Sequence, residues 1–152
     1  MTPSRHQKAA SPLRDDVSAL ADSLVPLYEK KLHLIELLRG NTAALRSYML
    51  SDDQGSFDDV CAKDEAITLE ADGIDTDIAK LKDELSRITG LTPDDAFKRA
   101  VSPSSQGKKI AALRKQIDSV LAQTMKDRSE IIQELEKRSG ALKQSETELE
   151  AM

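Results

Sequence analysis

The sequence predicts an all-α fold: an elongated antiparallel three-helix bundle or coiled coil, with one short extra helix before the last long helix. Apolar residues recur at alternating steps of three and four over long stretches, which is the spacing of one helix face. Charged residues make up 32% of the chain and aromatic residues only 3%, and there is no tryptophan. A composition rich in Leu, Ala, Lys and Glu is typical of long helices.

The first long helix is predicted over about residues 15–50, after a disordered N-terminal tail over residues 1–11. Pro26 predicts either a kink or a helix that starts near Ser23, because proline costs about 3 kcal/mol in a helix interior. Gly40 is also unfavourable, but the spacing continues across it, so we expect a continuous helix there. Ten positions form the predicted buried face, of which eight are apolar: Val17, Leu20, Leu24, Leu27, Lys31, Leu34, Leu38, Asn41, Leu45 and Tyr48.

The second long helix is predicted over about residues 57–89, after a polar turn. Ser56 is the expected N-cap, and Gly90 suits the left-handed position after the last turn. Asp64 is the one polar residue on the stripe. We interpret it as a gap in the seam or a device that fixes register, with a paired buried carboxylate as the alternative. The ten stripe positions are Phe57, Val60, Asp64, Ile67, Ala71, Ile74, Ile78, Leu81, Leu85 and Ile88.

A short helix is predicted over about residues 93–101, with Thr92 as its N-cap and Pro93 at its first position. A linker follows, and the last long helix is predicted over about residues 108–150. We expect its apolar stripe to shift across the helix face, as a four-residue insertion in a heptad would cause. The stripe residues are Ile110, Leu113, Ile117 and Val120, then Leu121, Met125, Ile132, Leu135, Leu142 and Leu149.

We interpret residues 12–152 as a single helical bundle domain. The distribution of charge along the chain narrows the classes of partner that this domain could bind. Net charge is −5, and residues 51–100 carry six Lys or Arg against fourteen Asp or Glu. This acidic middle argues against binding nucleic acid, which needs a basic face. No apolar run approaches the ~18 residues of a membrane span, and the N-terminus lacks the apolar core of a signal peptide. We therefore expect a cytoplasmic protein.

Few residues in the chain could perform catalysis, so we expect no enzyme, no cofactor and no catalytic or metal-binding residue. A di-metal helical site needs Glu-x-x-His twice. The chain has His6 and His33, and Glu29 precedes His33 by four residues rather than three. Cys61 is the only cysteine and has no histidine near it in the sequence. We interpret it as a small core thiol.

The thinning apolar stripe at the end of the last helix is the candidate partner-binding surface. After Leu135 the apolar density falls, so the final turns are expected to be weakly held in the free protein. Two interpretations stay open: a helix tail that lies on the bundle, or an amphipathic arm that takes an apolar partner helix. The candidate residues are Ile132, Leu135, Leu142 and Leu149.

In the pattern and order of its elements, the chain resembles the FlgN family of flagellar export chaperones over roughly residues 17–149. The resemblance begins with the leucine-rich helix LADSLVPLYEKKLHLIELL and the acidic helix VCAKDEAITLEADGIDTDIAKLKDEL. It continues through the bend TGLTPDD to the last long helix, KKIAALRKQIDSVLAQTMKDRSEIIQEL.

This resemblance implies a cytoplasmic chaperone of type III flagellar export. Its partners would be the amphipathic C-terminal helices of hook-associated proteins, which form the hook–filament junction, and the export apparatus. The chaperone would keep these proteins unassembled and deliver them for export, using the C-terminal residues that match, Ile132, Leu135, Leu142 and Leu149. The competing interpretation is a structural or adaptor coiled-coil protein that binds other helices or its own copies, so a homo-oligomer stays open.

Overall fold

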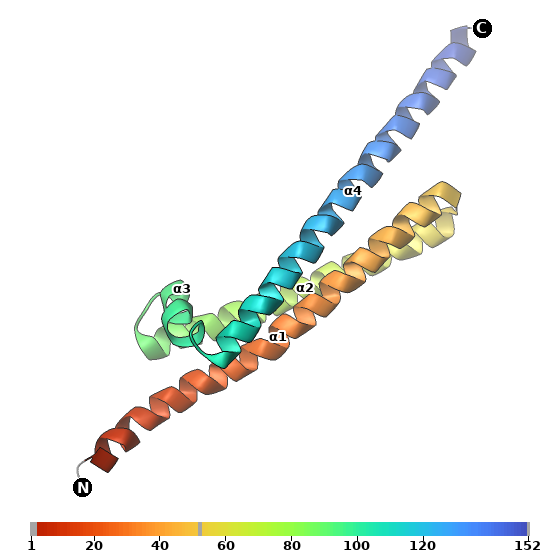
Figure 1. Cartoon of the computed structure of the whole chain (residues 1–152). Helices are drawn as coiled ribbons and strands as arrows, with labels where there is room; N and C mark the ends of the chain where they lie inside the picture. Colours follow the sequence, from red (N-terminus) through yellow and green to blue (C-terminus); the bar gives the residue numbers. More distant parts are fainter. Residues whose placement is uncertain (1–2, 52, 152) are drawn as a thin grey trace.

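Three long helices packed antiparallel make up most of the molecule, which confirms the predicted all-α fold (Figure 1). The computed structural model describes the backbone of residues 3–51 and 53–151, and the side chains of residues 13–51 and 53–151. A short helix precedes the last long helix, as expected, and it continues into a π-helical turn that the sequence did not predict. The bounds are α1 Pro3–Ser51, α2 Gln54–Thr89, α3 Pro93–Ala96, the π-helical turn η1 Phe97–Val101 and α4 Ser105–Ala151.

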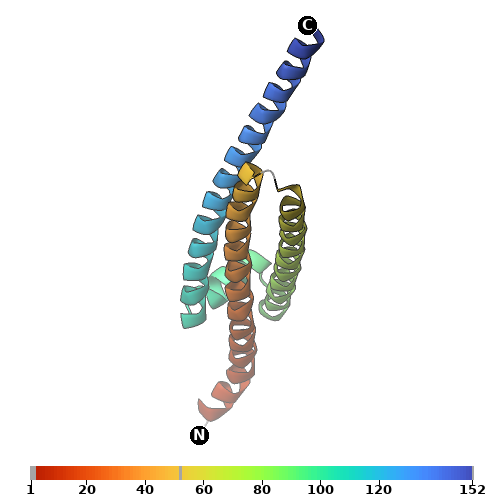
Figure 2. The same cartoon turned by 90° about the vertical axis from the view of Figure 1, so that its right-hand side faces the viewer.

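Helix α1 is the central element of the bundle. Both α2 and α4 pack extensively on α1 and contact each other much less, so α1 lies between them (Figure 2). A helix covered on two sides needs a wider apolar face than one with a single neighbour. The predicted stripe supplied only part of that face. A second row at seven-residue spacing is also buried: Ala21, Tyr28, Ile35, Thr42 and Met49.

Helix α1 runs without a break through Pro26 and Gly40. The prediction that the helix starts near Ser23 is therefore wrong, and the prediction that it continues through Gly40 is confirmed. Helical backbone also covers residues 3–11, where the sequence led us to expect a disordered tail, while residues 1 and 2 lie outside the described part. Helical hydrogen bonds join residues four apart in the chain, so a helix can extend beyond the packed region.

The turn between α1 and α2 is capped by Asp53 and not by Ser56. The Ser56 backbone N–H donates to Asp53 Oδ1 at 3.1 Å, and the Ser56 hydroxyl donates to Oδ2 at 2.7 Å. These two hydrogen bonds lower the pKa of the Asp53 carboxyl. A carboxylate three residues before Ser56 thus takes the N-cap position predicted for the serine.

The segment between α2 and α4 closes one end of the bundle, and its caps are those predicted. Gly90 has a φ of 72° and follows the last turn of α2, and the Asp95 N–H donates to Thr92 Oγ1 at 3.3 Å. Ala96 and Val101 are fully buried, as expected for residues that pack this segment onto the core. Helix α4 begins at Ser105, somewhat earlier than the predicted start near residue 108.

Gly107 allows α4 to begin in direct contact with η1. A Cβ atom at this position would lie 1.9 Å from the carbonyl oxygen of Val101, so no other residue fits without a backbone shift. The Gly107 N–H donates to Ser104 Oγ at 3.0 Å, which holds the first turn of α4 in place.

We predict that Gly107→Ala lowers the free energy of unfolding by about 1–3 kcal/mol, because the methyl group overpacks a backbone contact. Gly73→Ala is the matched control, since a Cβ there meets nothing within 4 Å. It should stabilise α2 by up to about 1 kcal/mol through helix propensity alone. Urea unfolding followed by circular dichroism measures both changes in the free energy of unfolding. Equal changes for the two variants would contradict the close contact between Gly107 and the Val101 carbonyl oxygen.

Candidate partner-binding surface

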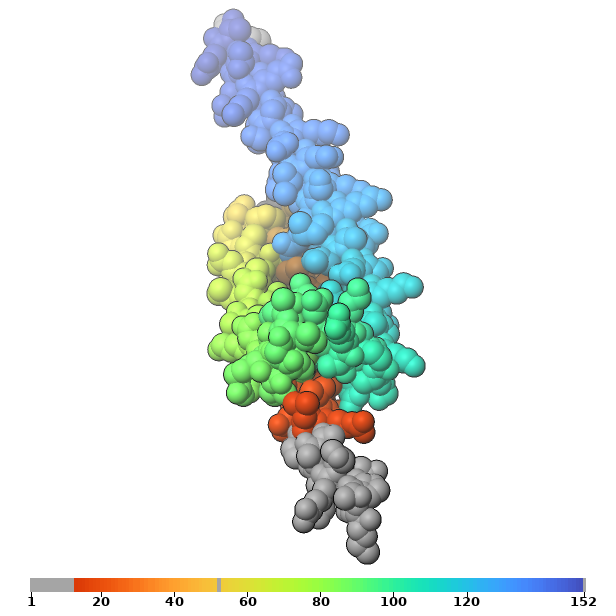
Figure 3. Space-filling model, turned by 90° about the vertical axis from the view of Figure 1, so that its left-hand side faces the viewer, coloured from red at the N-terminus to blue at the C-terminus, as the bar shows by residue number. Residues whose placement is uncertain are grey.

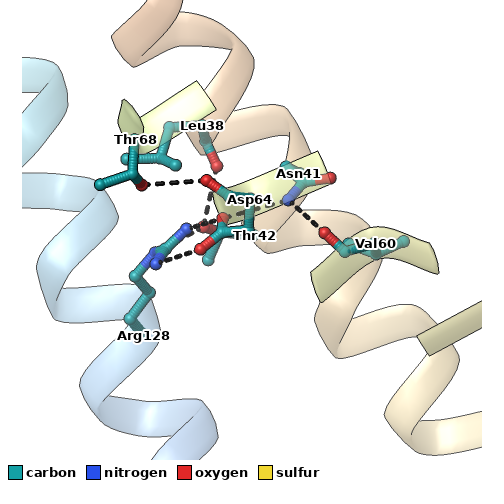
Figure 4. Close-up of polar contacts among 7 residues, drawn as sticks. All are labelled: Leu38, Asn41, Thr42, Val60, Asp64, Thr68 and Arg128. Carbon is teal, nitrogen blue, oxygen red and sulfur yellow. Dashed lines mark hydrogen bonds and ion pairs between the residues drawn. The ribbon is translucent and has the colours of Figure 1, made fainter. Parts of the chain in front are cut away.

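A polar layer ties the three long helices together in the part of the bundle nearer the turn between α1 and α2 (Figure 4). The Arg128 guanidinium on α4 pairs with both carboxylate oxygens of Asp64 on α2, with Nη1 2.9 Å from Oδ2. Arg128 Nε also donates to Thr42 Oγ1 at 3.0 Å, and Asn41 Nδ2 donates to Asp64 Oδ1 at 3.1 Å. Asp64 is therefore a paired carboxylate, and the interpretation of it as a gap in the seam is wrong.

This layer fixes the register of α4 against the other two helices. A guanidinium group that donates two hydrogen bonds to one carboxylate requires one relative orientation of the two groups. A shift of α4 along its axis therefore breaks several hydrogen bonds at once. Thr42 is 1% exposed, and no buried side-chain nitrogen or oxygen lacks a hydrogen-bond partner among the described residues. The layer is thus fully satisfied, as a buried polar network has to be.

The buried face of α4 keeps a strict seven-residue spacing, and the predicted shift of its stripe is wrong. Met125 and Ile132 are 57% and 55% exposed, although the shifted stripe included both. Arg138 takes the next position of the true row and donates to the Met49 carbonyl oxygen at 3.0 Å. The row contains polar residues, which hid it from an apolar pattern: Ile110, Ile117, Thr124 and Ile131.

Beyond Arg138, helix α4 projects past the turn that joins α1 to α2 (Figures 1 and 3). We call residues 132–151 the arm. Every residue from 139 to 151 is exposed, and Leu142 and Leu149 are 67% and 68% exposed. The interpretation of this segment as a helix tail that lies on the bundle is therefore wrong.

The apolar row of the arm continues the side of α4 that faces the bundle. Leu135 lies four residues after the buried Ile131, and Leu142 and Leu149 follow at steps of seven. Residues at these spacings share one helix face. Ile132 precedes Leu135 by three residues and lies at the edge of the same row. The structure thus places all four candidate residues on one uncovered surface.

A groove of about 320 Å³ lies where the arm leaves the bundle. Leu135 and Leu142 line it from the arm, and Tyr48 and Phe57 line it from the ends of α1 and α2. Both aromatic residues are only half-buried. Apolar spacing alone assigns both to buried seams and does not mark them as part of this surface. Their position on either side of the polar turn was the signal that could have placed them at the end of the bundle.

The remaining reactive side chains lie apart from the arm. His33 is exposed, and Cys61 is half-buried. Burial raises the pKa of the Cys61 thiol, and the charges of Asp58 and Asp64 raise it further, so the uncharged thiol is favoured. Within residues 13–51 and 53–151, no group of three His, Cys, Asp or Glu side chains could hold a metal ion. In the described part of the chain, no helix is both long and apolar enough to cross a bilayer.

Comparison with known proteins finds no match for this chain among protein-family models, characterised proteins or solved structures. The arm, the groove at its base and the polar layer that positions them are therefore the basis for assigning a function.

We predict that Arg128→Ala lowers the free energy of unfolding by roughly 1–3 kcal/mol. The substitution leaves the Asp64 carboxylate largely buried without its partner, and the partial exposure of the pair keeps the loss below that of a fully buried one. Arg46→Ala breaks the exposed pair with Glu130, which joins α1 to α4, and should cost at most about 1 kcal/mol.

Urea unfolding of both variants, with the double variant Asp64→Leu/Arg128→Met, checks this. The double variant removes both charges together and should recover most of the loss. An Arg128→Ala protein as stable as Arg46→Ala would show that the polar layer does not fix the helices.

Proposed function

We propose that this chain is a cytoplasmic chaperone of flagellar type III export. In this proposal it binds the C-terminal helices of hook–filament junction proteins, keeps them unassembled and delivers them to the export apparatus. The activity is binding and release, with no catalytic step and no cofactor. The observation that carries the proposal is the uncovered apolar row of the arm, and the resemblance described above supplies the class of partner.

The energetics of the arm suit a partner that is held and then released. A helix whose side chains are all exposed is marginal in water, so the end of the arm gains order when a partner covers it. Covering the exposed parts of Leu135, Leu142 and Leu149 stabilises the complex by roughly 2–5 kcal/mol, before the partner's own apolar surface is counted. Ordering both segments offsets part of this gain, which leaves a moderate affinity.

A structural coiled-coil protein that pairs with its own copies is the competing function. In a parallel pair of arms, Glu146 would lie close to its own copy beside the seam, because it lies four residues after Leu142 and three before Leu149. Two carboxylates held close together beside a seam are unfavourable. This position disfavours a parallel pair of copies.

Hydrogen exchange over residues 108–152 tests the proposal directly. We expect fast exchange after about Leu135 in the free protein, and protection when peptides from the C-terminal helices of flagellar junction proteins are added. Scrambled peptides of the same composition are the control. Strong protection to the end of α4 without a peptide, and no change on addition, would refute the chaperone function.

We further predict that Leu142→Asp weakens binding of these peptides by about tenfold or more, because a charged side chain replaces an apolar contact of over 1.4 kcal/mol. Leu69→Asp is the matched control, since Leu69 is 71% exposed on α2 and lies outside the groove. Both variants should unfold at the same temperature as the parent. Titration calorimetry measures the affinities, and equal affinities for the two variants would place the binding surface elsewhere.

A further inference from the structure

The sign of the charge changes along the arm: Glu134 and Glu136 come first, a basic stretch follows, and the last turns are acidic. Lys137, Arg138 and Lys143 lie in residues 137–143, which contain no acidic residue. Residues 144–151 contain three glutamates and no Lys or Arg: Glu146, Glu148 and Glu150. In the described structure none of these glutamates forms an ion pair, and all are exposed.

The acidic end of the arm is electrostatically unfavourable by itself. Glu146 and Glu150 lie four residues apart on one helix, so their like charges repel each other, and Glu148 adds a third negative charge. A partner that brings positive charge to this end relieves the repulsion. The N-terminal end of another helix carries the matching partial positive charge.

Glu146 makes the requirement for a cation specific. It lies three residues before Leu149, as Ile132 does before Leu135, so it borders the apolar row, and a helix that covers Leu142 and Leu149 passes beside its carboxylate. A carboxylate covered by apolar side chains is costly unless an opposite charge pairs with it. A partner of this row therefore needs a Lys or Arg opposite Glu146.

The base of the arm carries both signs of charge, since Glu134 and Glu136 lie beside Lys137 and Arg138. Arg138 is half-buried beside the groove, where it donates to the Met49 carbonyl oxygen and lies 3.9 Å from Glu134. Asp53, the one acidic residue of the groove, already accepts two hydrogen bonds from Ser56. The C-terminal end of a helix, with its free carbonyl groups, fits beside Arg138 better than an N-terminal end does.

We propose that the arm binds an amphipathic helix that runs antiparallel to α4, with Lys or Arg in its N-terminal half and its last turn in the groove at Tyr48 and Phe57. Leu149 follows Leu135 by 14 residues, so the matching helix has about four turns and a length of ~21 Å. The inference rests on the proposed function only in that the arm binds a helix, and it adds the direction and the charge pattern of the partner.

Two synthetic peptides of about four turns test the charge pattern. Both carry leucines at steps of three and four and the same numbers of Lys and Glu. One has its Lys residues in the N-terminal half, and the other has them in the C-terminal half. At low salt, we expect the full-length protein to bind the first peptide about fivefold or more tightly than the second, with the preference shrinking as salt screens the charges.

Variants of the protein show whether Glu146 causes this preference. Glu146→Lys should abolish or reverse it, whereas Glu65→Lys, an equal change of net charge at an exposed position of α2, should leave it unchanged. Circular dichroism confirms that both variants keep the helical content of the parent. A preference that survives Glu146→Lys would overturn the assignment of the cation to this residue.

Disulfide trapping tests the direction. In a Cys61→Ser background, Ala151→Cys places a thiol at the end of the arm, and the favoured peptide carries a cysteine at either its N- or its C-terminus. The antiparallel arrangement predicts faster trapping of the N-terminal cysteine. Equal rates, or faster trapping of the C-terminal cysteine, would overturn it.

The outcomes separate this inference from the proposed function. Equal affinity of the protein for the two synthetic peptides would overturn only the inference. The same holds if the protein binds junction-protein peptides but neither synthetic peptide. Failure to bind any peptide overturns both. A second copy of the chain is the other possible occupant of this surface, and sedimentation of the free protein tests for it. A dimer that the Leu142→Asp substitution dissociates would show that a second copy binds there, and would also overturn the inference.

Discussion

The pairing of Arg128 with Asp64 determines which part of α4 is covered and which part is free. Apolar contacts alone tolerate sliding of one helix along another, because leucine and isoleucine rows repeat every seven residues. The guanidinium, held also by Thr42, selects one of these repeats. With α4 fixed at this level, its last turns extend beyond the turn that joins α1 and α2. The free surface is thus a consequence of a polar contact between helices at another place on α4.

The position of α1 explains why the bundle depends on such a contact. Since α2 and α4 both pack on α1 and scarcely touch each other, few apolar contacts hold α2 and α4 in a fixed relation. Arg128 and Asp64 join these two helices directly. Ion pairs such as Lys31 with Asp75 and Lys109 with Glu29 add to the same alignment at the surface, each with a small contribution.

Much of the fold could be predicted from the sequence, because helix periodicity and the residues that end helices are local signals. Gly90 and Thr92 were assigned correctly on this ground. The register of α4 could not be predicted, since Thr124 and Arg138 occupy seam positions where an apolar pattern expects Leu or Ile. Leu142 and Leu149 were identified because apolar residues stand out in a polar segment. Tyr48 and Phe57 were missed because their exposure depends on where α4 passes them.

The arm also sets the dimensions of any complex formed on it. Its uncovered row continues the side of α4 that faces the bundle, so a helix bound there lies beyond the end of the bundle and alongside a segment that already projects (Figure 2). An isolated helix of about four turns bound there would add width and not length. It would bring this thin end of the molecule closer to the width of its middle.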